Sequence, residues 1–124
     1  MPHIILKKTF KIKPSGFQVA NEKSFSFHGL IQQNEITAIN QRLASLRVSG
    51  KATTLHFAMD AHGHYFASMN HDTQKHYEED IVVMILDIME TLGYTFRFQY
   101  DSQTTSVKLT GDSFTSRELF IFTK

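Results

Sequence analysis

The sequence contains no cysteine. This absence excludes thiolate nucleophiles, cysteine-based redox chemistry and zinc sites built from cysteine. The chain must therefore be stabilised by an apolar core, and its composition is adequate for one: 41% of the 124 residues are hydrophobic, including 11 phenylalanines. A chain of this length is expected to form one α+β domain over residues 1–124.

Long apolar runs are also absent. The longest uninterrupted run extends from Ile81 to Leu86, whereas a membrane-spanning helix needs roughly 20 apolar residues. The first residues place two lysines after a very short apolar segment, which is unlike a signal peptide. We therefore expect a cytoplasmic protein with no membrane partner.

Neither sign of charge is in excess. The chain has 13 Lys and Arg against 12 Asp and Glu, for a formal charge of +1, so we expect no nucleic-acid partner. The one basic cluster includes Lys7, Lys11 and Lys13, which share one face of a strand, opposite Phe10 and Ile12. Such alternation is typical of the solvated face of a half-buried strand.

The segment 78–93 has the strongest helical pattern. Its three opening acids suit the positive end of a helix dipole, and Gly93 closes it where a left-handed cap residue is expected. Apolar residues recur at helical spacing and cover most of the first two turns. Such a helix needs cover on more than one side, from one deep core or from a second subunit. For the second case, the predicted interface residues are Ile81, Val82, Met84 and Ile85.

The remaining pattern predicts one more helix and several strands. Asn34 is the expected N-cap of an amphipathic helix that ends before Gly50. Strands are expected over residues 4–13, near 25–27, over 53–59 and 65–69 as a β-hairpin, and over 94–100, 106–110 and 119–122, with a turn at 101–104. The predicted fold is α+β, with a mostly antiparallel sheet of about six to seven strands and two helices packed on one face.

Aromatic residues alternate from Tyr94 through Phe96 and Phe98 to Tyr100. Strict alternation would place all four side chains on one face of a strand, and we expect that face to pack beneath the helices. The alternative is a platform for stacking single-stranded bases.

Histidines are concentrated in and around the predicted hairpin. His62 and His64 are candidate ligands for zinc or another transition metal, with His56, His71 and Asp60 as additional ligands. No ordered metal motif accompanies them, so solvated turn histidines are the simpler interpretation. A small metal-dependent or acid–base enzyme that uses this hairpin is the alternative.

Recognisable catalytic motifs are absent. The sequence has no Gly-x-Ser-x-Gly elbow, no phosphate-binding Gly-x-x-x-x-Gly-Lys loop and no Gly-x-Gly-x-x-Gly. We therefore expect no catalysis and no cofactor. A small-ligand-binding protein with a pocket between the helices and the Phe-rich sheet is a further alternative.

Segments at both ends of the chain resemble one family. The opening residues 1–6, the segment 84–94 with its Leu-Asp pair and Gly-aromatic ending, and the closing residues 119–124 are similar, in the same order, to the GTP cyclohydrolase I feedback regulatory protein family. The resemblance implies a non-enzymatic homopentamer that binds a partner enzyme and is modulated by a small aromatic or pterin ligand. The expected function is a regulatory or interaction module that self-associates and binds a partner protein.

Overall fold

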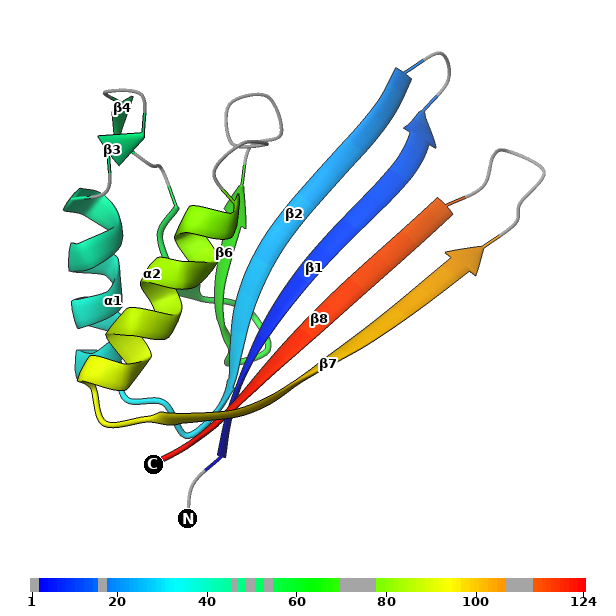
Figure 1. The fold of residues 1–124 in the computed structure, drawn as a ribbon. Coiled ribbons are helices and arrows are strands. Elements are labelled where there is room, and N and C mark those ends of the chain that lie inside the picture. Colours follow the sequence, from blue (N-terminus) through cyan, green and yellow to red (C-terminus); the bar gives the residue numbers. More distant parts are fainter. Residues whose placement is uncertain are drawn as a thin grey trace.

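The protein has two layers, a six-stranded antiparallel sheet and two helices on one of its faces (Figure 1). The computed structural model describes residues 3–15, 18–45, 47–48, 51–52, 55–69, 78–106 and 113–124. This arrangement confirms the predicted α+β fold with two helices on one face. Neither of the described helices is long and apolar enough to cross a membrane.

The sheet order is β5-β6-β2-β1-β8-β7, and each neighbouring pair is antiparallel. Pairing of β1 with β8 brings the two ends of the chain together (Figure 1). In chain order the elements are β1 (His3–Ser15), β2 (Gln18–Gly29), α1 (Gln33–Ser45), β3 (Arg47–Val48), β4 (Lys51–Ala52), β5 (Ala58–Met59), β6 (Tyr65–Met69), α2 (Glu78–Thr91), β7 (Thr95–Ser106) and β8 (Ser113–Thr123).

The core lies between the helices and one end of the sheet. On this helix side, Leu6 of β1 faces Phe27 of β2 and Phe120 of β8 in the strand register, and all three side chains are buried. The long strands β1, β2, β7 and β8 run on past the helices (Figure 1). The helices contribute Ile36, Ile39, Leu43, Ile81, Ile85, Ile88 and Met89 to the core.

Helix α2 ends where the sequence predicts. Gly93 has φ +94°, a left-handed conformation that glycine adopts without steric cost. The Tyr94 N–H donates to Met89 O at 2.9 Å and the Gly93 N–H donates to Glu90 O at 3.0 Å, which together form a Schellman cap. The cap directs the chain into β7.

Helix α1 begins differently from the prediction. Gln32, rather than Asn34, is the N-cap, because its carbonyl accepts the N–H groups of Glu35 and Ile36, both at 3.1 Å. The Glu35 carboxylate in turn accepts the Gln32 N–H at 3.0 Å, which is the acidic half of a capping box. A reciprocal bond of this kind outweighs the intrinsic capping preference of Asn34.

Glu35 is the most deeply placed of the described acids, at 4% exposed. Besides Gln32, its carboxylate accepts hydrogen bonds from the Tyr94 hydroxyl at 2.8 Å and Lys124 Nζ at 3.0 Å. Burial alone would raise the pKa of Glu35, but the hydrogen bonds from Gln32, Lys124 and Tyr94 outweigh it and lower that pKa below its ordinary value. Burial, followed by the Glu35 carboxylate, raises the pKa of Tyr94 to about 12.

The first strand of the predicted hairpin is shorter than expected. Residues 53 and 54 lie outside the described residues, and β5 covers only Ala58–Met59. The Asn40 side chain explains why residue 57 is not in the strand. Its Nδ2 donates to Phe57 O at 2.9 Å, and its Oδ1 accepts the Phe57 N–H at 2.8 Å. The amide of α1 thus takes the place of a strand partner.

The predicted turn at 101–104 is wrong. Strand β7 continues through this segment to Ser106 and pairs with β8 along its length, for example Asp101 with Glu118. Among the described residues, the end of the chain forms two long paired strands, β7 and β8, in place of the shorter strands and the turn that the sequence predicts. The segment is polar because it lies beyond the helix layer, where neither face of the strand joins the core (Figure 1). Residues 107–110 of the predicted intervening strand lie outside the described residues.

Substitution Glu35→Gln should lower the free energy of unfolding at pH 7 by about 1–3 kcal/mol, because it removes a charged acceptor from three donors. The pKa of Glu35 is lowered in the folded state, so its stabilisation is complete above the ordinary value of 4.5 and is lost as the pH falls through the folded pKa. Denaturant unfolding at pH 7 and pH 3 measures both effects.

The matched control is Glu90→Gln, which changes an exposed acid of α2. Its unfolding free energy should stay close to that of the wild type at both pH values. If Glu35→Gln lost as much stability on acidification as the wild type does, the Glu35 network would not be a source of the acid sensitivity.

Candidate binding surface on the open face of the sheet

A β-bulge in β7 separates the four alternating aromatic residues. The register with β8 shifts between Phe96 and Phe98, so that Arg97 is the extra residue. Phe96 faces Phe122 on the helix side, whereas Phe98 faces Ile121 on the opposite side. One added residue reverses the direction of all side chains that follow it. The prediction that the four aromatics share one face beneath the helices is therefore wrong.

We call the side of the sheet away from the helices the open face. Phe98 and Tyr100 project from it with 56% and 57% of their surfaces exposed. Half-buried aliphatic side chains on β8 and β1 continue this apolar surface across the sheet. The residues of this apolar strip are Ile5, Phe98, Tyr100, Leu119 and Ile121.

A groove of about 390 Å³ lies beside the apolar strip, on strands β8, β1, β2 and β6 and the turn before β6. We call it the basic groove. Its centre is Thr9, which faces Ser24 of β2 on one side and Arg117 of β8 on the other. The lining residues are Lys7, Thr9, Lys11, Ser24, Ser26, His28, Asp60, His62, His64, Phe66 and Arg117.

The charges of the basic groove are unequal. Among the described residues that line the groove, Lys7, Lys11 and Arg117 are the basic side chains other than histidine, and Asp60 is the one carboxylate. Within the described part of the chain, none of these three cations is joined to a carboxylate by an ion pair. Positive groups thus predominate among the described lining residues, although the total charge of the chain is near neutral.

A hydrogen-bonded turn brings two of the predicted histidines to the groove. Asp60 Oδ1 accepts the backbone N–H groups of His62 and His64, both at 2.9 Å. The His64 bond is the main reason that the pKa of Asp60 lies below its ordinary value. This turn joins β5 to β6, which confirms the predicted hairpin.

His28 of β2 meets His64 across the strands, with ring centroids 4.2 Å apart. Burial lowers the pKa of His28, and the neighbouring His64 and Lys7 lower it further, so the neutral ring predominates at pH 7. His28 Nε2 lies 3.0 Å from Ser26 Oγ. A hydroxyl beside an imidazole has the composition of a nucleophile–base pair, but no third residue of the described chain forms a hydrogen bond that orients the ring as in a triad.

The other predicted metal ligands are not assembled around His62 and His64. His56 lines a different hollow, between α1 and β5 on the helix side, and His71 lies outside the described residues. The described residues contain no group of three or more histidines and carboxylates placed to hold a metal ion. The zinc site stays a prediction.

The predicted interface residues of α2 divide into two pairs. Ile81 and Ile85 are completely buried in the core of the single chain, so neither offers surface to a partner. Val82 and Met84 pack against the core but remain partly exposed. A subunit contact on this helix stays a prediction for Val82 and Met84.

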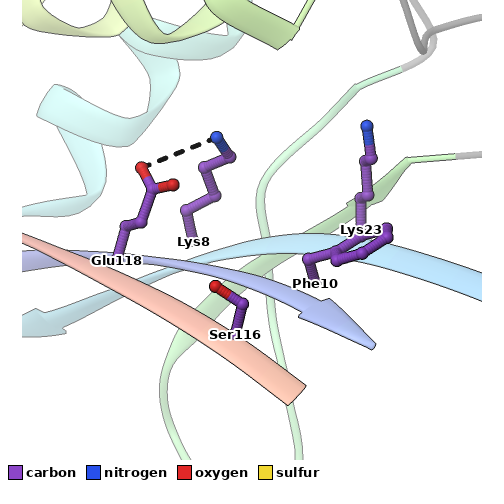
Figure 2. A pocket seen from close by; sticks show the side chains of 5 residues that line it. All are labelled: Lys8, Phe10, Lys23, Ser116 and Glu118. Atoms are coloured by element: carbon purple, nitrogen blue, oxygen red, sulfur yellow. Dashed lines mark ion pairs between the residues drawn. The ribbon is translucent and has the colours of Figure 1, made fainter. Parts of the chain in front are cut away.

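The helix side has a smaller hollow of about 210 Å³ where the strands run past the helices. Its charged groups are balanced: Lys8 Nζ lies 3.6 Å from Glu118 Oε2, and Lys23 Nζ lies 5.5 Å from the centre of the Phe10 ring (Figure 2). Because its cations already face a carboxylate and an aromatic ring, this hollow offers less to a ligand than the basic groove does.

Sequence reasoning missed the part of the groove that strand pairing assembles. It treated Lys7 and Lys11 as a solvated strand face and did not connect them with Arg117, which is more than a hundred residues away. A weak signal was present in β2, where Ser24, Ser26 and His28 alternate with buried phenylalanines. Pairing that polar face with the face of Lys7 would have indicated half of the groove.

Substitution Asp60→Ala should loosen the histidine turn, because the backbone N–H groups of His62 and His64 lose their acceptor. Amide hydrogen exchange at these two residues, followed by NMR, should become faster than in the wild type. Asp60→Asn keeps an Oδ1 acceptor and should retain most of the protection. Equal exchange in the alanine variant and the wild type would show that the side chain does not hold the turn.

No protein-family model matches the chain, and no curated protein matches it in sequence. The resemblance to the feedback regulatory protein family thus stays a prediction. Among solved structures, the chain is similar to the crystal structure of a conserved kinetoplastid-specific protein from Trypanosoma cruzi, with a TM-score of 0.58 and 13% sequence identity over 97% of this chain and 94% of that one. At this sequence identity, the similarity shows a shared fold alone.

Proposed function

We propose that this protein is a non-enzymatic interaction module that self-associates edge to edge through strand β7 of two copies. The observation that carries the proposal is the long outer edge of β7, which is flanked by exposed aromatic side chains. Binding of a partner enzyme and modulation by a pterin or aromatic ligand remain what the family resemblance implies.

The backbone of β7 supports this proposal. β7 has 12 residues and is the terminal strand of the six-stranded sheet, whereas β5, at the opposite edge, has two. Within the described part of the chain, no strand pairs with the outer side of β7. The N–H and C=O groups on that side are a template for a further strand, and two copies of β7 running antiparallel would satisfy each other.

The side chains of β7 support it too. Phe96 on the helix side and Phe98 and Tyr100 on the open face are 46–57% exposed. In proteins that remain monomeric, the edge strands of a sheet are often short or carry charged side chains that oppose pairing. The only charged residues from 95 to 106 are Arg97 and Asp101. Arg97 Nε donates to Thr123 Oγ1 of β8 at 2.7 Å, so its guanidinium group is held against the neighbouring strand.

Symmetry favours a closed dimer. Two antiparallel copies of the same strand form an isologous contact, in which one surface meets itself across a two-fold axis. Such a contact uses up the edge and ends assembly at two chains. The pentamer of the family resemblance needs two different surfaces on each chain, so molar mass separates the two arrangements.

Light scattering over a concentration series should give the wild type a molar mass of twice the 14.3 kDa chain. The double substitution Phe98→Lys with Tyr100→Lys should reduce it to that of one chain. The added lysines would meet like charges across the two-fold axis and would be desolvated in the contact. Both residues are more than half exposed in the single chain, so the variant should keep its fold.

The control is Val83→Lys, which places a lysine at a comparably exposed apolar position of α2. This variant should remain dimeric. A wild type that stays monomeric over the series, or a double variant that stays dimeric, would contradict pairing through β7. A mass of five chains would instead support the ring that the family resemblance implies.

A further inference from the structure

We propose that the basic groove on the open face binds a small organic phosphate. The phosphate group would lie over Thr9, between Lys7, Lys11 and Arg117, and the organic portion would lie against Phe66 and the ring pair of His28 and His64. This inference is independent of self-association, because one chain supplies the whole groove.

Strand geometry allows the three cations to meet at one point. Lys7 and Lys11 lie two residues before and after Thr9, about 6.6 Å away along β1, and Arg117 faces Thr9 from a strand about 4.8 Å away. Lysine side chains extend on flexible four-carbon stems, and the arginine offers a planar fork that matches two phosphate oxygens. A dianion above Thr9 would therefore be within reach of all three.

Neutral donors surround the same point. Thr9 carries a hydroxyl, and Ser24 faces it on β2, while Ser26 faces Lys7 in the next row of the sheet. All three residues line the groove. Hydroxyl groups donate to phosphate oxygens without adding charge. The Ser26 hydroxyl already contacts His28 Nε2 at 3.0 Å, which leaves the hydroxyls of Thr9 and Ser24. Three cations with these two hydroxyls suit a compact, highly charged, oxygen-rich group better than they suit a single carboxylate.

The remainder of the groove suits a flat organic group. Its volume of about 390 Å³ lies in the range of small-molecule sites, about 300–1,000 Å³, and exceeds what a lone phosphate fills. Phe66 is 39% exposed, and the His28 and His64 rings stand 4.2 Å apart beside it. Asp60 belongs to the turn of His64, and its Oδ1 already accepts two backbone N–H groups.

The extent of the positive charge favours a small ligand over a nucleic-acid strand. Among the described lining residues, Lys7, Lys11 and Arg117 surround one point, and Arg97 beside the apolar strip is already bonded to Thr123. A nucleic-acid strand needs cations along a path of several phosphates. One cluster of three is sufficient for one phosphate group.

The test compares two ligands that differ only in the phosphate, adenosine monophosphate and adenosine, by calorimetric titration at low salt. The monophosphate should bind at least tenfold more tightly, because only its phosphate engages the cations. Inorganic phosphate should compete with it, and added salt should weaken its binding. Equal binding of the two ligands, or no binding of either adenosine monophosphate or inorganic phosphate, would overturn the proposal.

Two variants locate the site. Lys7→Gln and Arg117→Gln should each weaken adenosine monophosphate binding by about tenfold. The matched control is Lys8→Gln, which changes the next residue of β1; that lysine points to the helix side and pairs with Glu118, so affinity should be unchanged. Thermal melts followed by circular dichroism confirm that each variant is folded.

Further outcomes separate this site from its competitors. Unchanged affinity in both Lys7→Gln and Arg117→Gln would place binding elsewhere and overturn the assignment. A single-stranded oligonucleotide that binds more tightly with each added nucleotide would show a strand-binding surface and overturn the small-ligand proposal. Light scattering on the same samples records the number of chains separately, so a failure of β7 pairing is distinguishable from a failure of the groove.

Discussion

The β-bulge at Arg97 determines what the open face of the sheet can do. Before it, Tyr94 and Phe96 lie on the helix side, where Tyr94 is buried and bonded to Glu35. After it, Phe98 and Tyr100 lie on the open face. Without the bulge, regular alternation would turn all four rings toward the helices, and the apolar strip would lose Phe98 and Tyr100. One residue thus divides an apparently uniform aromatic stripe between the core and the surface.

Local patterns predicted the elements that local physics determines. The repeat of Ile81, Ile85 and Ile88 and the terminal Gly93 predicted helix α2 and its cap, because both depend on residues within a few turns of one another. The polar turn at 60–64 predicted the hairpin for the same reason. Two helices over an antiparallel sheet followed from the order of these elements and the short connections between them.

Features that depend on distant residues were not predictable in this way. The bulge cannot be recognised in a sequence that alternates regularly. The polar segment 101–104 has the composition of a turn, and only its pairing with β8 shows that it is part of a strand. The side chain of Asn40 replaces a strand partner for Phe57 across 17 residues. The basic groove joins Lys7 to Arg117 only because β1 lies beside β8. The local positive charge of the groove could not be inferred from the total charge, which is +1 for the whole chain.

Edge pairing and the basic groove have a shared geometric consequence. A two-fold axis that pairs antiparallel β7 strands in one continuous sheet stands perpendicular to that sheet, so both open faces lie on the same side. Measured across the strands, the path from β1 of one copy to β1 of the other crosses β8 and β7 twice, which is five strand spacings, or about 24 Å. The position of the axis along β7 sets an additional displacement along the strands. The two phosphate sites and both apolar strips would thus lie on one shared surface. A ligand carrying two phosphate groups at matching distance would then bind the dimer more tightly than either site alone, because its second contact is intramolecular.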